Sequence, residues 1–278
     1  DERLDRTAWS VVINRWQRTL VAAVLASAVT TATVGCVDRS GGPESGDVPN
    51  ASIHISAAAS LTDVFTVIAE QFELHNPNTR LSTSFGSSST IVDQVINGAP
   101  VTALATASEA TMNDAVKAHV IAGTPQVFAL NQLAIVVPAG NPANIESIAD
   151  LGRTQVKLAI CQPQVPCGQA ARELFTRARV PLVPVTFESD VRAVLAKAAS
   201  GEVDAGIVYR SDVIAGGTAV ASIPIPDSIN VSTRYPIAAI ANSEGQLVVG
   251  KFIDFLLSPG AQLVLADHGF TPITAKSR

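Results

Sequence analysis

Positive charge, aromatic residues and histidine are all scarce in this sequence of 278 residues. Lysine and arginine together number 19 against 24 aspartates and glutamates, which gives a formal net charge of -5 at neutral pH. A nucleic-acid-binding protein needs a basic face, so this charge balance argues against that class. The sequence also lacks a P-loop, a dinucleotide-binding glycine fingerprint and a cluster of metal ligands, so no motif indicates nucleotide or metal chemistry.

The abundant residues favour a tightly packed α/β protein. Hydrophobic residues make up 47% of the chain and aromatic residues only 5%, with alanine and valine supplying much of the apolar content. This composition is typical of a folded chain and not of a disordered one. The length suits one large domain or two small ones.

The first 35 residues have the features of a secretory signal. Arg15 and Arg18 precede an apolar run over residues 20–34, which ends at small residues before Cys36. The run is too short, and too rich in serine and threonine, to indicate a transmembrane helix. We therefore expect a signal peptide over residues 1–35.

Cys36 lies at the end of a tetrapeptide that resembles a lipobox, the signal for lipidation of a bacterial lipoprotein. In Thr33-Val34-Gly35-Cys36, a threonine stands where an aliphatic residue is usual. An ordinary signal peptide that happens to contain a cysteine is the alternative. Residues 36–50 are rich in Gly, Ser, Pro and Asp and have no apolar periodicity, which predicts a lipid-anchored flexible tether.

Two further cysteines, Cys161 and Cys167, lie in an expected loop that contains Pro163 and Pro166. Export would permit a disulfide between them, and a bridge is the interpretation that we favour. The alternative is a pair of small buried hydrophobic residues.

Strand and helix patterns alternate from residue 53 onward. Residues 53–57 alternate like a strand, and residues 61–72 then carry apolar side chains at helical spacing. Residues 133–137 and 156–160 are nearly all apolar, as expected for central strands covered on both faces. The alternation predicts largely parallel sheets with helices on both faces. Further strands are expected at 81–85, 206–209 and 237–241. Further helices are expected at 91–96, 169–179 and 247–257, and another follows residues 189–191 and runs to about residue 199.

Small and hydroxyl-bearing residues occupy the points where strands lead into helices. Ser60 is placed to be a helix N-cap, and Asp63 three residues later would complete a capping box. Residues 86–90 contain three successive serines, more than one cap needs. Free N–H groups and aligned peptide dipoles favour anions at such helix N-termini, although most serine caps only cap. These loops would gather beyond the carboxyl ends of the strands, where ligands of open α/β sheets bind.

Five segments, in order, resemble the signature segments of the periplasmic molybdate-binding proteins (ModA). The ending at residues 252–270 is also similar to the close of many type II binding proteins, and the resemblance spans residues 51–273. The five segments are Ala57-Ala58-Ala59-Ser60-Leu61-Thr62, Phe85-Gly86-Ser87-Ser88-Ser89-Thr90, Val165-Pro166-Cys167-Gly168, Glu188-Ser189-Asp190-Val191-Arg192 and Gly206-Ile207-Val208-Tyr209-Arg210-Ser211-Asp212.

The resemblance implies a two-lobed α/β fold, the type II periplasmic-binding-protein (Venus-flytrap) fold with a two-strand hinge. Lobe 1 would comprise residues 51–130 and 237–278, and lobe 2 residues 131–236. A protein of this family captures molybdate, and we expect tungstate to bind similarly. It delivers the anion to the membrane permease of an ABC importer with a separate cytoplasmic ATPase. The chain would then be a monomer without enzymatic activity or cofactor, lipid-anchored on the extracytoplasmic face of the cell membrane.

The resemblance also implies which residues contact the oxyanion. Ser60 and Ser88 would provide hydroxyl and backbone donors from the first lobe. Cys167 and Val191 would provide backbone N–H groups from the second lobe, and Tyr209 its phenol. No residue would ligate a metal directly, because molybdenum would be held through its oxygens.

Four positions near these contacts depart from the family pattern or carry a charge. Cys167 replaces the alanine usual in the family, which a backbone donor tolerates, and Thr102 stands where aspartate is common. Arg192 and Arg210 are adjacent to contact positions. Because the family neutralises its ligand with dipoles and neutral hydrogen bonds, we interpret both arginines as structural.

Three other functions are compatible with parts of the sequence. Another oxyanion, such as sulfate or phosphate, is the nearest alternative, although phosphate would profit from a carboxylate that accepts its proton. An exported serine hydrolase is a second, but there is no Gly-x-Ser-x-Gly elbow. A scaffolding lipoprotein that lost its ligand is the third. The available bases, which we interpret as structural or surface residues, are His54, His75, His119 and His268.

Overall fold

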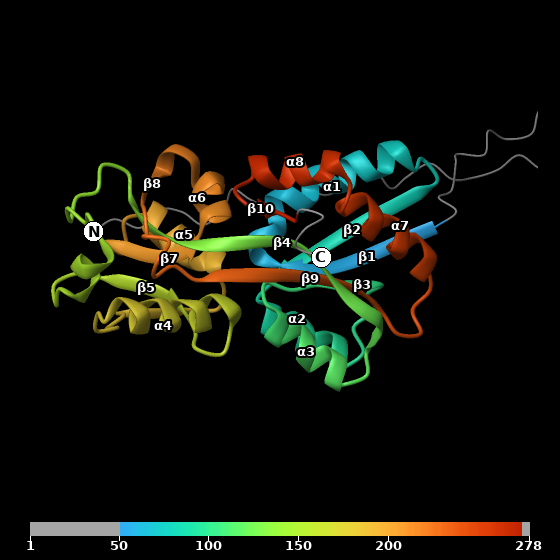
Figure 1. Cartoon of the computed structure of the whole chain (residues 1–278), viewed down its shortest axis with the longest axis horizontal. Coiled ribbons are helices and arrows are strands. Elements are labelled where there is room, and N and C mark those ends of the chain that lie inside the picture. Colours follow the sequence, from blue (N-terminus) through green and yellow to red (C-terminus); the bar gives the residue numbers. More distant parts are fainter. Residues whose placement is uncertain (1–50, 274–278) are drawn as a thin grey trace, which may run out of the picture. The chain divides into compact units, whose positions relative to one another are not determined.

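Two β-sheets share one long strand, β4 (Ile121–Pro138), in the computed structural model (Figure 1). The structure describes residues 51–273, which lie within one compact unit. The signal peptide expected over residues 1–35, the lipidation at Cys36 and the tether over 36–50 lie outside the described residues. The strands follow the order β2-β1-β3-β9-β4-β7-β5-β6, and β8 and β10 also pair with β4.

The first sheet combines strands from both ends of the described chain. Its parallel strands β1, β2 and β3 meet the antiparallel β9 and the first part of β4. Helices α1, α7 and α8 cover one face, and α2 and α3 cover the other (Figure 1). The bounds are β1 (Ala51–Ala58), β2 (Thr79–Gly86), β3 (Ala103–Ala105), β9 (Ser232–Ile240), β10 (Thr271–Pro272), α1 (Thr62–His75), α2 (Ser88–Ile96), α3 (Glu109–Lys117), α7 (Gln246–Leu256) and α8 (Pro259–Asp267).

The few aromatic residues of the chain concentrate in the core of this first lobe. The ring centroid of Phe65 lies 5.6 Å from that of Phe128 and 6.0 Å from that of Phe252, and Phe72 lies 5.2 Å from Phe252. These contacts hold α1 against β4 and α7. Among the described residues no single helix is long and apolar enough to span a membrane; α7 and α8 meet that test only as a pair, bent by 66°.

The second sheet has a largely aliphatic core, with Phe175 and Tyr209 as its buried aromatic residues among those described. Residues 133–138 of β4 pair with β7 and β8, and β7 continues in parallel to β5 and β6. Gly206 of β7 lets α5 approach closely, because a Cβ there would lie 2.6 Å from Val194 Cγ1. The bounds are β5 (Leu158–Cys161), β6 (Thr186–Glu188), β7 (Ala205–Tyr209), β8 (Val220–Ile223), α4 (Pro166–Ala178), α5 (Val191–Ala199), α6 (Arg210–Gly216), and the 3-10 helices η2 (Ile148–Gly152) and η3 (Gly217–Ala219).

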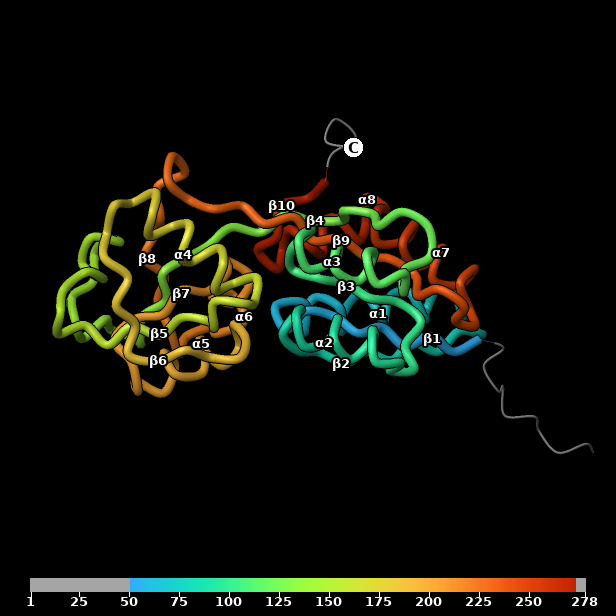
Figure 2. The backbone as a smooth tube through the Cα atoms, turned by 90° about the horizontal axis from the view of Figure 1, so that it is seen from below, coloured from blue at the N-terminus to red at the C-terminus, as the bar shows by residue number. Residues whose placement is uncertain are grey.

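Strands β4 and β9 connect the two lobes (Figure 2). In the first sheet, β4 pairs with β9 as far as Gln132 with Ser232, and from Leu133 it pairs with Tyr209 of the second sheet. The lobes therefore have separate hydrophobic cores joined by two strands. The boundaries proposed for the lobes remain predictions; the one between residues 236 and 237 falls inside β9.

Candidate binding site

Helix N-termini from both lobes surround one small cavity. Its space, including its opening to solvent, is about 230 Å³, smaller than the roughly 300–1,000 Å³ typical of pockets for drug-sized ligands. The five residues predicted to contact an anion all line it: Ser60, Ser88, Cys167, Val191 and Tyr209. The other lining residues are Ala58, Ala59, Gly86, Ser87, Ala107, Val165, Pro166 and Asp190.

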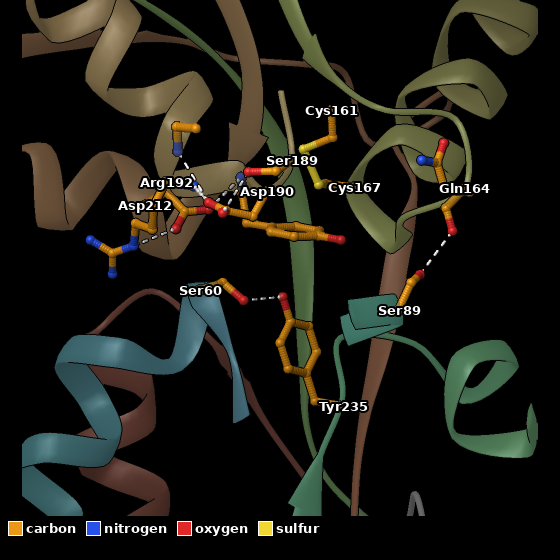
Figure 3. The surroundings of a disulfide bond; sticks show 12 residues. Ser60, Ser89, Cys161, Gln164, Cys167, Ser189, Asp190, Arg192, Asp212 and Tyr235 are labelled. Carbon is orange, nitrogen blue, oxygen red and sulfur yellow. Dashed lines mark hydrogen bonds and ion pairs between the residues drawn. A yellow bond between two sulfur atoms is a disulfide. The ribbon is translucent and has the colours of Figure 1, made fainter. Parts of the chain in front are cut away.

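Ser60 lies in a short 3-10 helix, η1 (Ala59–Leu61), between β1 and α1. The predicted capping box of Ser60 and Asp63 was wrong, because this turn delays the start of α1 and places Leu61 at the cap position. The buried Ser60 hydroxyl instead lies 2.9 Å from Tyr235 Oη (Figure 3). That hydrogen bond fixes the hydroxyl at the cavity wall.

Ser87 and Ser88 lie where β2 leads into α2. Ser88 Oγ accepts a hydrogen bond of 3.0 Å from the Ala107 N–H. Because that bond uses a lone pair, the hydroxyl proton is free to be donated to an anion. Ser87 occupies the N-cap position, but its side chain makes no capping bond. Both serines are buried.

The disulfide between Cys161 and Cys167 joins the end of β5 to the first turn of α4 (Figure 3). Pro166 begins the helix, where its fixed backbone angle is favourable and its missing N–H costs nothing. Gly168 packs so tightly that a Cβ would lie 1.9 Å from the Gln162 carbonyl oxygen. The amide of Cys167, which has no carbonyl partner within its own helix, is thereby held at the cavity.

Asp190 determines which amides of α5 remain available. As the N-cap of α5, its carboxylate accepts hydrogen bonds from Arg192 N (2.9 Å) and Ala193 N (3.1 Å). These two amides are therefore satisfied, whereas the Val191 N–H at the first helical position is not served by the cap. This arrangement leaves Val191 as the amide donor of α5 beside the cavity.

Tyr209 ends β7 with its side chain fully buried. Its ring centroid lies 5.9 Å from that of Tyr235 in a T-shaped arrangement, and its Oη has no hydrogen-bond partner among the described residues. Burial raises the pKa of the Tyr209 phenol far above its ordinary value, and the nearby Asp212 carboxylate adds to the increase. The phenol therefore keeps its proton and can act only as a neutral donor to an anion.

Asp212 and Arg192 form a charged pair behind this wall (Figure 3). Asp212 Oδ2 accepts the Tyr209 N–H at 3.0 Å, and Oδ1 lies 3.2 Å from Arg192 Nε. Arg192 also pairs with Asp63 of the first lobe. Burial raises the pKa of Asp212 to about 7, although the Arg192 charge and the Tyr209 N–H lower it. Arg192 does not line the cavity, which is consistent with a structural role.

The cavity carries little formal charge. Among the described residues that line it, Asp190 is the only charged one and none is a histidine. His54 lies between the Ser82 and Ser84 hydroxyls, while His75 and His268 bond to carbonyls of their own helices. Within residues 51–273, no group of three or more His, Cys, Asp or Glu residues is placed to hold a metal.

Sequence reasoning missed three residues of this site. Ala107 follows β3, a strand of only three residues that no periodicity indicates. Tyr235, the partner of Ser60, lies in the part of β9 that precedes the expected strand. Ser87 belongs to a segment that the sequence singled out, but only Ser88 was selected from it.

Comparison with known proteins agrees with this architecture. The sequence profile of bacterial extracellular solute-binding proteins matches residues 53–271. The molybdate-binding protein ModA of Mycobacterium tuberculosis is 37% identical over 219 residues, which cover 79% of this chain and 84% of the relative. The periplasmic molybdate-binding protein of Azotobacter vinelandii superposes with a TM-score of 0.71 at 19% identity, covering 80% of this chain and all of that one. The sulfate-binding protein SubI of M. tuberculosis gives 0.73 at 21% identity, covering 82% and 88%. The two structures confirm the type II periplasmic-binding-protein fold.

Proposed function

This chain belongs to the bacterial extracellular solute-binding proteins and is the substrate-binding protein of an ABC transporter, and we propose that its substrate is molybdate. The observation that carries the proposal is the convergence of the five predicted contacts on one small cavity. Hydroxyls reach it from the first lobe, and amides and a phenol reach it from the second. The same donors would bind tungstate.

The chemistry of the cavity supports a fully deprotonated tetrahedral oxyanion. Molybdate has no proton to donate at neutral pH, so it needs donors and no acceptor. The dipoles of α2, α4 and α5 point their positive ends at the cavity, which favours negative charge without a basic side chain. A protonated phosphate would need a free carboxylate, but Asp190 already accepts bonds from two amides and from Ser189 Oγ at 3.1 Å.

Sulfate is the second candidate, because it is also fully deprotonated and would use the same donors. Discrimination between the two anions would rest on the fit of the anion to the cavity. The solute-binding family is non-enzymatic, and we propose the same for this chain. Turnover of an ester, abolished by Ser88→Ala, would revive the hydrolase alternative.

The two-lobed architecture supports a proposal for how the anion is delivered. We propose that the lobes close over molybdate about β4 and β9, and that the closed protein docks on a membrane permease served by a separate ATPase. Ser89 Oγ donates to the Gln164 carbonyl oxygen at 2.9 Å across the lobes, as expected of contacts that hold a closed state (Figure 3). We propose that the protein acts as a monomer, and that export through residues 1–35 and lipidation at Cys36 would keep it at the membrane.

Calorimetric titration with molybdate, tungstate, sulfate and phosphate tests the proposal. We expect tight one-to-one binding of molybdate and tungstate and weak or undetectable binding of the other two. Binding of sulfate or phosphate alone would keep the transport role and refute the substrate. No heat with any of the four would favour a scaffolding role.

A further inference from the structure

Ser87 carries a buried hydroxyl that has no hydrogen-bond partner within residues 51–273. The residue is 7% exposed, and its Oγ is covered from solvent without a hydrogen bond to any described residue. A hydroxyl in this situation loses its water and gains nothing in return, so such groups are rare in folded proteins and call for an explanation.

Helix capping does not explain this serine. Ser258 at the start of α8 accepts a hydrogen bond from the Ala261 N–H, and Ser108 at the start of α3 accepts one from Thr111. Ser87 occupies the equivalent position of α2 but makes no such bond. The Ser87 hydroxyl therefore does not stabilise α2 by capping it.

The position of Ser87 indicates what that is. Ser87 lines the same cavity as Tyr209, whose Oη is likewise buried and unpartnered, and it directly precedes Ser88 at the N-terminus of α2. Neither the resemblance nor the comparisons assign it a role. We propose that Ser87 Oγ donates a hydrogen bond to the bound oxyanion, as a third hydroxyl from the first lobe beside those of Ser60 and Ser88. This inference rests on the proposed function.

The hydroxyl can be removed without removing a structural interaction. Because Ser87 makes no capping bond, Ser87→Ala should leave the melting temperature of the ligand-free protein unchanged or slightly raised. Its affinity for molybdate should fall by about tenfold or more, the effect of losing a hydrogen bond to a charged group. Ser258→Ala is the matched control: it removes a real cap far from the cavity, so the melting temperature should fall while affinity is unchanged.

Titration of the full chain and its variants with molybdate separates the outcomes. Failure of the wild-type protein to bind molybdate would refute the proposed function and this inference with it. Equal affinity of the wild-type protein and Ser87→Ala would refute only the role of Ser87. A crystal structure with molybdate gives a second measurement: we expect Ser87 Oγ within about 3 Å of an oxyanion oxygen, and an oxygen beyond hydrogen-bond reach would overturn the proposal.

Discussion

The two walls of the cavity present donors of different chemical origin. The first-lobe wall is lined by three serines, Ser60, Ser87 and Ser88, whereas the second-lobe wall combines backbone amides at Cys167 and Val191 with a single side-chain donor, the Tyr209 phenol. A hydroxyl disappears with a single substitution, but an amide stays whatever the side chain. The second wall therefore tolerates unusual residues, such as a cysteine in place of alanine, provided that the backbone keeps its place.

What holds each wall follows from this difference. The first wall depends on individual side-chain bonds, such as that between Ser88 Oγ and the Ala107 N–H. The second depends on interactions that hold its backbone in place: the Cys161–Cys167 disulfide, the Asp190 cap and the pair of Asp212 with Arg192. Substitutions in the first wall should act on affinity, and substitutions behind the second should act first on stability.

Removal of Asp212 should break the second wall most severely. Asp212→Ala leaves the Tyr209 N–H and Arg192 Nε without their buried partner, so we expect the free energy of unfolding to fall by about 3 kcal/mol in urea titrations at neutral pH. This is the lower end of the usual range, because the Arg192 side chain is 26% exposed and keeps Asp63. Asp227→Ala is the control, since Asp227 is exposed and pairs loosely with Arg210 at 3.7 Å.

The same variant reports on the titration of Asp212. Burial raises its pKa from 3.8 to about 7, so between these values the folded protein holds the proton more tightly than the unfolded chain. The contribution of Asp212 to stability is therefore complete at low pH and declines as the pH rises. The stability difference between wild type and Asp212→Ala should narrow from about pH 4 to about pH 7; a widening difference would contradict the shift.

Ser88→Ala tests the first wall. It deletes the hydroxyl that we propose donates to the oxyanion, and it should weaken molybdate binding by about 1.5–3 kcal/mol. Calorimetry measures the loss directly. Ser89→Ala is the neighbouring control, because the Ser89 hydroxyl bonds across the lobes and not into the cavity, so its effect should be smaller. Unchanged affinity in Ser88→Ala would remove Ser88 from the site.

Reduction of the disulfide offers a way to perturb the second wall alone. Reduction should lower stability by about 2 kcal/mol, as expected for so short a loop, and should weaken molybdate binding by loosening the Cys167 amide. The double variant Cys161→Ala, Cys167→Ala should show both losses and no further response to reductant. If the reduced and oxidised proteins bind molybdate equally, the bridge does not position this amide.

Asp63→Asn should have the smallest effect of these substitutions, because Asp63 contributes only to the contact between the two walls. The pair of Asp63 with Arg192 is half-exposed, so its loss should cost about 1 kcal/mol or less. We expect faster dissociation of molybdate in stopped-flow measurements and a smaller difference at high salt. Glu70→Gln on the same helix is exposed and makes no ion pair in the described structure, so dissociation there should match wild type.

The sequence was most informative where strands lead directly into helices. The expected strands at residues 53–57, 81–85 and 206–209 lie within β1, β2 and β7, and the five predicted contacts line one cavity. Apolar alternation and turn residues are local, so a single sequence carries them. The order of five short segments added what local patterns lack, namely which loops face one another.

The features that the sequence did not predict depend on contacts between residues far apart in the chain. Ser60 was expected to cap α1, but its hydroxyl is taken by Tyr235, far along the chain. The first part of β4 was not expected, because Gly123, Thr124 and Pro125 interrupt its apolar pattern, and it is stabilised by pairing with β9. The resemblance named Ser88 alone, and no local pattern indicates that the hydroxyl of the neighbouring Ser87 is buried without a partner among the described residues.

The position of β3 between β1 and β9 has a consequence for the nascent chain. Ala103 pairs with Ala239 and Ala105 with Ile237. One partner of this short strand is therefore synthesised long after the strand itself. Until residues 232–240 emerge, β3 has an open edge that other chains could join. The strands of the second sheet all lie before residue 224, so that sheet can form while the first sheet still lacks its last strands.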